Sequence, residues 1–171
     1  MNELRARSLH SADTLAARSG ESVWIGTAHE GGRSSSTTCS APTRAPRSCG
    51  WAAICRSHAS GVGKTLLAFD HGLRRPRGPA PRFTDRTLTE SSALAAELYE
   101  IRQRGWAASV DERTEGESAI GAPIRDGSGR VVGAVSIAGR TDRLTEAGLP
   151  RAALAAQVTD AARDISSALL H

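Results

Sequence analysis

The six residues Ser-Gly-Val-Gly-Lys-Thr, at positions 60–65, have the types and order that could bind a phosphate. Glycines followed by Lys64 and Thr65 are typical of the loop that wraps the phosphates of a nucleotide. The complete signature has a further glycine where this chain has His58, and no hydrophobic strand directly precedes the stretch. The residues therefore favour a helix N-terminus with glycines for close packing. A nucleotide hydrolase stays open as a remote alternative.

The ligand types of a zinc site occur in one part of the chain, at Cys39, Cys49, Cys55 and His58. They form no C-x-x-C pair, and their spacing fits no standard zinc module. We therefore predict unpaired thiols in a loop, with no metal and no other cofactor.

A nucleophile with its base is the third kind of chemistry to consider. Ser60 is near His58 in the sequence, and Ser118 is near Asp111 and Glu112. Closeness in the sequence does not set up the geometry that nucleophilic catalysis needs. We predict no catalytic residue and a protein that is not an enzyme.

Length and composition describe an ordinary globular protein. A chain of 171 residues, 39% hydrophobic and 23% charged, fits one domain with a real core. It contains no apolar run of the roughly 18 residues that a membrane-spanning helix needs. Its first residues lack the apolar segment of a secretion signal. These features predict a cytoplasmic protein with no membrane association.

The net charge of +4 arises in one segment rather than over the domain. Residues 31–57 contain four arginines and no acidic residue, whereas the rest of the chain balances 18 basic against 18 acidic residues. All three cysteines fall in the same segment. The charge is therefore poor evidence for a nucleic-acid-binding face.

Hydrophobic periodicity and turn residues predict an α+β domain with a largely antiparallel sheet flanked by helices. Thr89 is the predicted N-cap and Gly105 the predicted C-cap of one helix. The composition of 32–57 predicts loop or disorder. The predicted elements are helices at 2–19, 63–73, 90–104 and 146–169, strands at 22–30 and 106–110, a loop at 74–83, and a hairpin with strands at 119–125 and 130–137.

Several segments outside 32–57 together resemble one known family. They are "LAARSGESVWIGTAHEG" (15–31), "HASGVGKTLLAF" (58–69), "TLTESSALAAELYEIRQRGWA" (87–107), "DERTEGESAIGAPIRDGSGRVVGAVSIAG" (111–139) and "RLTEAGLPRAALAAQVTDAARDISSAL" (143–169). In this order, over about four-fifths of the chain, they closely resemble the C-terminal effector-binding domain of IclR-family bacterial transcriptional regulators. Several ordered matches are far more specific than a single motif.

The resemblance implies a GAF-like α/β fold in a single domain over 1–171 that binds a small, usually carboxylated metabolite. It also implies a homodimer or homotetramer. In such regulators the effector changes the affinity for DNA of a winged helix-turn-helix domain, which would precede residue 1 and is missing here. The predicted chain is thus a sensing domain without the part that reads DNA.

Carried over by position, the resemblance places Ser60, Gly61 and Val62 around the effector at the start of a helix. Ser136 would face it from the sheet, and Ala119 occupies a position where many relatives have Cys or Ser. A further acidic or polar contact would lie in the range Ser109 to Glu112. The chemistry fits an anion, because a helix N-terminus presents unpaired N–H groups and a partial positive charge. Ala119 and Ala138 lack the side-chain donors that some relatives use at these two positions.

The resemblance stops at residue 32 and resumes at His58. Relatives have a valine-rich strand in this interval, and serine codons of a GC-rich gene become valine codons when they are read one base out of phase. We hypothesise that residues 32–57 are encoded out of frame, between two compensating single-base changes. The alternative to a working sensor is then a non-functional remnant of such a regulator that binds nothing.

Overall fold

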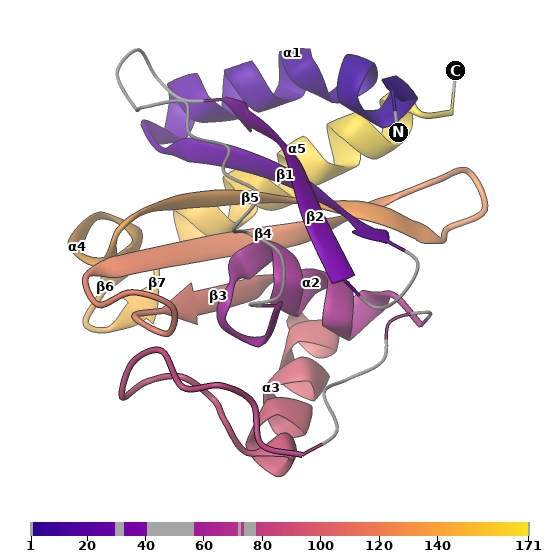
Figure 1. Ribbon diagram of the computed structural model, residues 1–171. Coiled ribbons are helices and arrows are strands. Elements are labelled where there is room, and N and C mark those ends of the chain that lie inside the picture. The colour runs from indigo at the N-terminus through magenta and orange to yellow at the C-terminus, as the bar shows by residue number, and fades with distance from the viewer. Residues whose placement is uncertain (1, 30–32, 41–56, 72, 74–77, 171) are drawn as a thin grey trace.

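The computed structural model describes residues 2–29, 33–40, 57–71, 73 and 78–170. Its centre is an antiparallel sheet of β1 (Ser22–His29), β2 (Arg33–Ser40), β3 (Ala107–Val110), β4 (Glu117–Arg125) and β5 (Val131–Arg140). The strands lie in the order β2-β1-β5-β4-β3 (Figure 1). A small second sheet pairs β6 (Thr145–Glu146) with β7 (Leu149–Pro150).

Helices cover both faces of the large sheet, as Figure 1 shows. They are α1 (Asn2–Ser19), α2 (Gly61–Phe69), α3 (Ser91–Arg104), α4 (Thr141–Leu144) and α5 (Ala152–Ala168), with a 3-10 turn η2 at Ser57–Ala59. α1 and α5 cover one face, α2 lies on the other, and α3 packs against α2. This mixture of helices and antiparallel sheet confirms the predicted α+β class, and it fits the GAF-like fold that the resemblance implies.

Alternation along the strands divides the residues between the two faces. On the α1–α5 side, the core includes Val23, Ile25, Ile120, Ala122, Ile124, Val135 and Ile137, packed on the buried faces of α1 and α5. On β4 and β5 the opposite face carries small residues such as Gly121 and Ser136, and α2 lies against them. Because small residues leave the room that close packing needs, α2 can lie directly on the strands.

The strand at 33–40 corrects the prediction of loop or disorder for that part of the chain. β2 pairs antiparallel with β1 from Val23↔Ser40 to His29↔Arg33, with a register shift between Ile25 and Gly26. The backbone hydrogen bonds of an adjacent strand override a composition that is weak for a core strand. Residues 41–56, the remainder of the segment, lie outside the described residues.

Two helix starts also differ from the prediction. α3 begins after Glu90, which makes no side-chain capping bond, so Thr89 is not the N-cap; Gly105 is the C-cap, with φ of 88°. The last helix begins at Ala152, not near 146. Ala147 and Gly148 have φ of 52° and 77°, a left-handed conformation that turns β6 into β7 instead of extending a helix.

The other predicted helices and strands are confirmed with shifts of a few residues at their ends, whereas residues 74–77 of the predicted loop lie outside the described residues. No helix within the described part of the chain is both long and apolar enough to cross a membrane.

Candidate functional site

Ser60 begins α2 and caps it. Its extended backbone (φ −128°, ψ 153°) stops the helix from running further back, and its Oγ accepts a hydrogen bond from Gly63 N at 3.0 Å. An α-helix leaves its first four N–H groups without intrahelical partners, and the serine hydroxyl satisfies one of them. The stretch at 60–65 is therefore an N-cap followed by the first turn of a helix, as the sequence predicts.

Gly61 brings this helix start into direct contact with the sheet. A Cβ atom at Gly61 would lie 2.6 Å from Ser136 Oγ and 3.0 Å from Ala119 Cβ. A Cβ atom at Gly121 would in turn lie 2.7 Å from both Gly61 O and Thr65 Oγ1. Real Cβ atoms do not approach so closely, so glycine is needed on the helix and on the strand. Three of the residues predicted to bind an effector thus meet here.

Ser136 and Ala119 occupy neighbouring strands on the α2 side of the sheet. Ser136 on β5 pairs with Gly121 on β4, and Ala119 pairs with Ala138. Ser136 is buried, and its hydroxyl donates to Ile137 O at 3.1 Å. Neither alanine adds a polar atom. The hydroxyl of Ser136 is therefore the polar group that these three sheet positions present.

Ser109 belongs to the same face but already has a hydrogen-bond partner. It is buried on β3 opposite Ala119, and its Oγ donates to Ala59 O at 2.7 Å. This bond ties the turn before α2 to the edge of the sheet. Val62 points to a different place, since it packs with Leu66 and Ala134 in a small apolar cluster. Ser109 therefore lies at the edge of the contact between Gly61, Ala119 and Ser136, whereas Val62 packs in the apolar cluster.

Glu112 forms a buried ion pair that the sequence did not reveal. Its Oε1 lies 2.7 Å from Nζ of Lys64, whose side chain is 0% exposed. Lys64 Nζ also donates to Ala108 O at 3.1 Å and lies 3.6 Å from Oε1 of Glu97. A lysine held in this way does not present its ammonium to a nucleotide phosphate. The geometry of 60–65 therefore differs from a phosphate loop in the residue that the loop needs most.

Burial raises the pKa of Glu112 above its ordinary value of 4.5, and the ammonium of Lys64 offsets part of this rise. The second carboxylate oxygen, Oε2, is buried without a hydrogen-bond partner. Such an atom is costly to bury in a charged carboxylate. Lys64 therefore stabilises a charge that would otherwise be unfavourable at this place.

The turn at 111–116 is held from both sides. Asp111 has φ of 55°, and its Oδ1 accepts from Gly116 N at 2.9 Å and from Thr141 Oγ1 at 2.5 Å. Two threonines of the loop before α3 bind its backbone: Thr84 Oγ1 donates to Asp111 O and Thr87 Oγ1 to Glu112 O. Asp111 and Glu112, the first two residues of this acidic turn, are thus half-buried and hydrogen-bonded.

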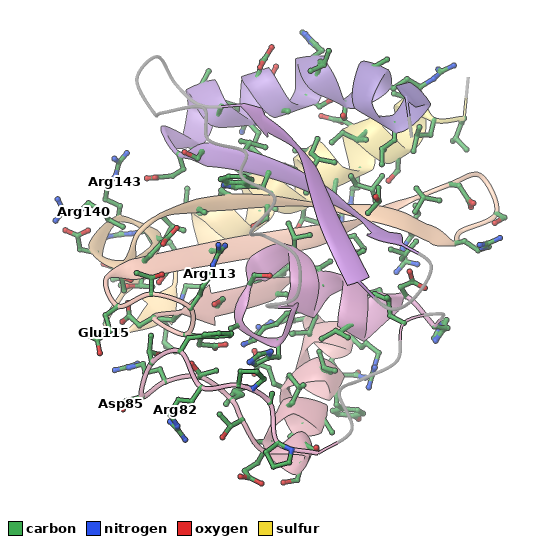
Figure 2. All side chains as sticks on the ribbon, viewed as in Figure 1. Arg82, Asp85, Arg113, Glu115, Arg140 and Arg143 are labelled. Carbon is green, nitrogen blue, oxygen red and sulfur yellow. The ribbon has the colours of Figure 1, made fainter. Side chains whose placement is uncertain are left out.

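A surface cleft of about 350 Å³ lies between this turn and the preceding loop. Figure 2 shows Arg82 and Asp85 on that loop below Arg113 and Glu115 on the turn. None of the seven residues predicted to bind an effector lines the cleft. Its lining residues are Thr84, Asp85, Arg86, Asp111, Glu115 and Gly116.

The zinc-type side chains are only partly described. Cys49 and Cys55 lie outside the described residues, and Cys39 lies on β2. His58 is buried, with Nε2 2.8 Å from Pro81 O and its ring stacked on Phe83. In the part of the chain that the structure describes, no three metal-binding side chains gather.

Lys64 is the residue that the sequence reading missed. Its type drew attention only as part of a phosphate-loop pattern, whereas its partners lie 44 and 48 residues further along the chain. A lone lysine in the first turn of an otherwise apolar helix is the signal that could have indicated a buried ion pair.

The matches to known proteins agree with this geometry. Residues 2–167 match the family model described as the bacterial transcriptional regulator IclR, C-terminal. The chain belongs to the IclR family. It corresponds to the regulatory, effector-binding part of these proteins, so the resemblance seen in the sequence is confirmed.

One similar protein is a glycerol operon regulatory protein of Streptomyces coelicolor. It is 39% identical over 168 residues, which are 97% of this chain and 66% of that protein. The chain thus spans about two thirds of the length of this IclR-family relative.

Solved structures show the same fold. The crystal structure of the Thermotoga maritima IclR has a TM-score of 0.83 at 24% identity, over 98% of this chain and 69% of that one. The inducer-binding domain of PobR from Acinetobacter, a double mutant in complex with 3-hydroxybenzoic acid, has a TM-score of 0.74 at 20% identity, over 92% of this chain and 94% of that one. At these identities the likeness is one of fold.

Proposed function

We propose that this IclR-family domain binds a small organic acid at the edge of the contact between the start of α2 and the strands β4 and β5, and that it associates with further copies of itself. The observation that carries the proposal is the close contact of Gly61 with Ser136 and Ala119. It brings the backbone at the start of α2 close to a serine hydroxyl.

The chemistry at this contact favours one anionic group. The N-terminus of a helix has a partial positive charge of roughly half an elementary charge and offers N–H donors. Ser136 adds one hydroxyl, which would turn from Ile137 O to donate to the anion. Ala119 and Ala138 surround it with methyl groups. We therefore expect a small acid with one carboxylate and few other polar groups.

Two relatives bear on the choice of ligands to test. The PobR inducer-binding domain holds 3-hydroxybenzoic acid within the same fold. The Streptomyces coelicolor protein is named for a glycerol operon, so glycerol belongs in the test as an uncharged alternative. In the intact regulator, binding would act on DNA through a winged helix-turn-helix domain outside these 171 residues, in the cytoplasm where bacterial DNA lies.

Thermal unfolding with added ligands tests the proposal. The panel is acetate, lactate, succinate, benzoate and 3-hydroxybenzoate, with the amide of each acid as the matched uncharged control, and glycerol. A ligand at one hundred times its Kd should raise Tm by roughly 5–10 °C, because it binds only the folded chain. The amides should give no rise.

Two further measurements complete the test. Ser136→Ala should weaken the effective acid and leave the Tm of the free protein nearly unchanged, and light scattering should give the mass of a dimer or tetramer. A rise in Tm with glycerol alone would exclude an organic acid as the ligand. If no ligand raises the Tm, the non-functional alternative is favoured.

A further inference from the structure

Lys64 is the single lysine of the chain, in which the other 21 basic residues are arginines. It is also fully buried, whereas none of the arginines whose side-chain exposure the structure describes is buried. The two side chains differ in shape: an ammonium is a compact charge with three donors, and a guanidinium is a wide planar fork. Among the lysine and arginine side chains with described exposure, the buried one is therefore the compact ammonium, which fits a small space.

The contacts of Lys64 join three separate segments of the fold. Its backbone lies in the first turn of α2, and its Nζ donates to Ala108 O on β3 at 3.1 Å. The same atom donates to Glu112 Oε1 at 2.7 Å, at the start of the turn between β3 and β4. β3 ends the sheet, so it has a neighbouring strand on one edge only among the described strands. Lys64 thus supplies a donor to a strand with few partners of its own.

These three segments carry the groups that the proposed effector would meet. Gly61, which faces Ser136, lies three residues before Lys64 on α2, and Ser109 follows Ala108 on β3. We propose that Lys64 is the positioning residue of the effector site: it holds the start of α2, strand β3 and the 111–116 turn at one fixed spacing without touching the effector. This inference rests on the proposed function.

The positioning depends on the ion pair and not on filling space. Glu112 has a buried, unpartnered Oε2, so the loss of the Lys64 charge leaves a carboxylate that must move toward water. The turn that carries Glu112 is joined to β3, so this movement would shift Ser109. Ser109 binds Ala59 just before α2, so the start of α2 would shift with it. Glu97 on α3 lies further from Nζ, at 3.6 Å, and also pairs with Arg104. We expect Glu97 to contribute little.

The test compares the full chain with Lys64→Met, Lys64→Met/Glu112→Leu and Glu97→Gln, the last as the matched control. The probe is the panel acid that stabilises the wild type most, and Kd is measured by calorimetry well below every Tm. Lys64→Met should bind at least tenfold more weakly. The double variant should regain the Tm of the wild type, because an apolar pair can replace a buried ion pair, yet still bind at least tenfold more weakly. Glu97→Gln should bind within twofold of wild type.

A second readout follows the ammonium itself. With one lysine in the chain, lysine-selective isotopic labelling gives a single side-chain NMR signal, and this signal should shift when the probe saturates the protein. A lysine of purely structural importance would show no shift. The inference is overturned if Lys64→Met or the folded double variant binds with the wild-type Kd. It is separable from the proposed function, whose failure would appear already as the absence of any stabilising acid for the wild type.

Discussion

Gly61 on α2 packs directly against Ser136 on β5, and any larger residue at position 61 would collide with the serine. A Cβ atom at Gly61 would lie 2.6 Å from Ser136 Oγ and 3.0 Å from Ala119 Cβ. The helix therefore approaches the sheet as closely as its backbone allows. This contact limits how closely the start of α2 and Ser136 can approach each other.

Gly61→Ala should therefore push α2 away from the strands. We expect a loss of about 1–2 kcal/mol in the free energy of unfolding, because overpacking a tight contact costs about that much. Urea unfolding measures the loss. Adding Ser136→Ala removes the nearer of the two crowded atoms and should restore part of the stability, whereas strict additivity of the two changes would show that the residues do not touch.

The Lys64–Glu112 pair should show strong coupling in stability. Lys64→Met leaves a buried carboxylate unpaired and should cost about 3–5 kcal/mol. Lys64→Met/Glu112→Leu removes both charges and should recover most of that loss. A double-mutant cycle in denaturant gives the coupling energy, and a value near zero would mean that the 2.7 Å contact contributes nothing.

Burial should also make one ion pair sensitive to pH. The pKa of Glu21 is raised above 4.5 by burial, although Arg143, with Nε 2.9 Å away, lowers it in part. A carboxyl with a raised folded-state pKa contributes stability that is fully present below its unfolded pKa and is lost as the pH rises through the folded value. Glu21→Gln has no such loss. The Tm of the variant minus the Tm of the wild type should therefore become more positive as the pH rises from 4.5.

The matched control for this measurement is Glu100→Gln, which removes an exposed carboxyl from α3. It reports the general effect of one charge fewer. A Tm difference for Glu21→Gln that stays flat with pH, or that falls as pH rises, would contradict the argument. The packing around Glu21 is close, since a Cβ atom at Gly139 would collide with its carboxylate.

The hypothesis of an out-of-frame segment is tested at the level of DNA. We predict that moving the reading frame by one base over the codons of 32–57 yields a valine-rich segment. Resequencing the gene region shows whether the two base changes are present. Stop codons or a polar sequence in the shifted frame would exclude the hypothesis. A chain with the corrected segment should unfold at higher temperature, since valine suits a strand better than serine does.

Most of the fold follows from short stretches of the sequence. The apolar spacing of residues 2–19 and the turn Asp126-Gly127-Ser128-Gly129 predict α1 and the β4–β5 hairpin, because helix periodicity and turn chemistry are local properties. The prediction was wrong where a partner elsewhere in the chain decides. β2 exists through its pairing with β1, and the composition of 33–40 contains no sign of that pairing.

The candidate site divides in the same way. The family resemblance indicated Gly61, Ala119 and Ser136, and the structure brings these three into contact. It could not indicate that Ser109 is bonded to Ala59 or that Val62 packs in an apolar cluster, because those outcomes depend on side-chain directions. The cleft beside Asp111 was likewise unforeseen, since its walls come from loops with no periodic pattern.

The sequence by itself determined the family and most of the elements in their order, because each follows from residue types a few positions apart. Only the tertiary structure decided what the lysine of "SGVGKT" does. Its charge is buried and bound to residues 44 and 48 positions away, and a buried charge persists only with partners that the fold brings to it. The stretch at 60–65, which resembles a phosphate loop in its sequence, is thus the start of a helix that packs against the sheet.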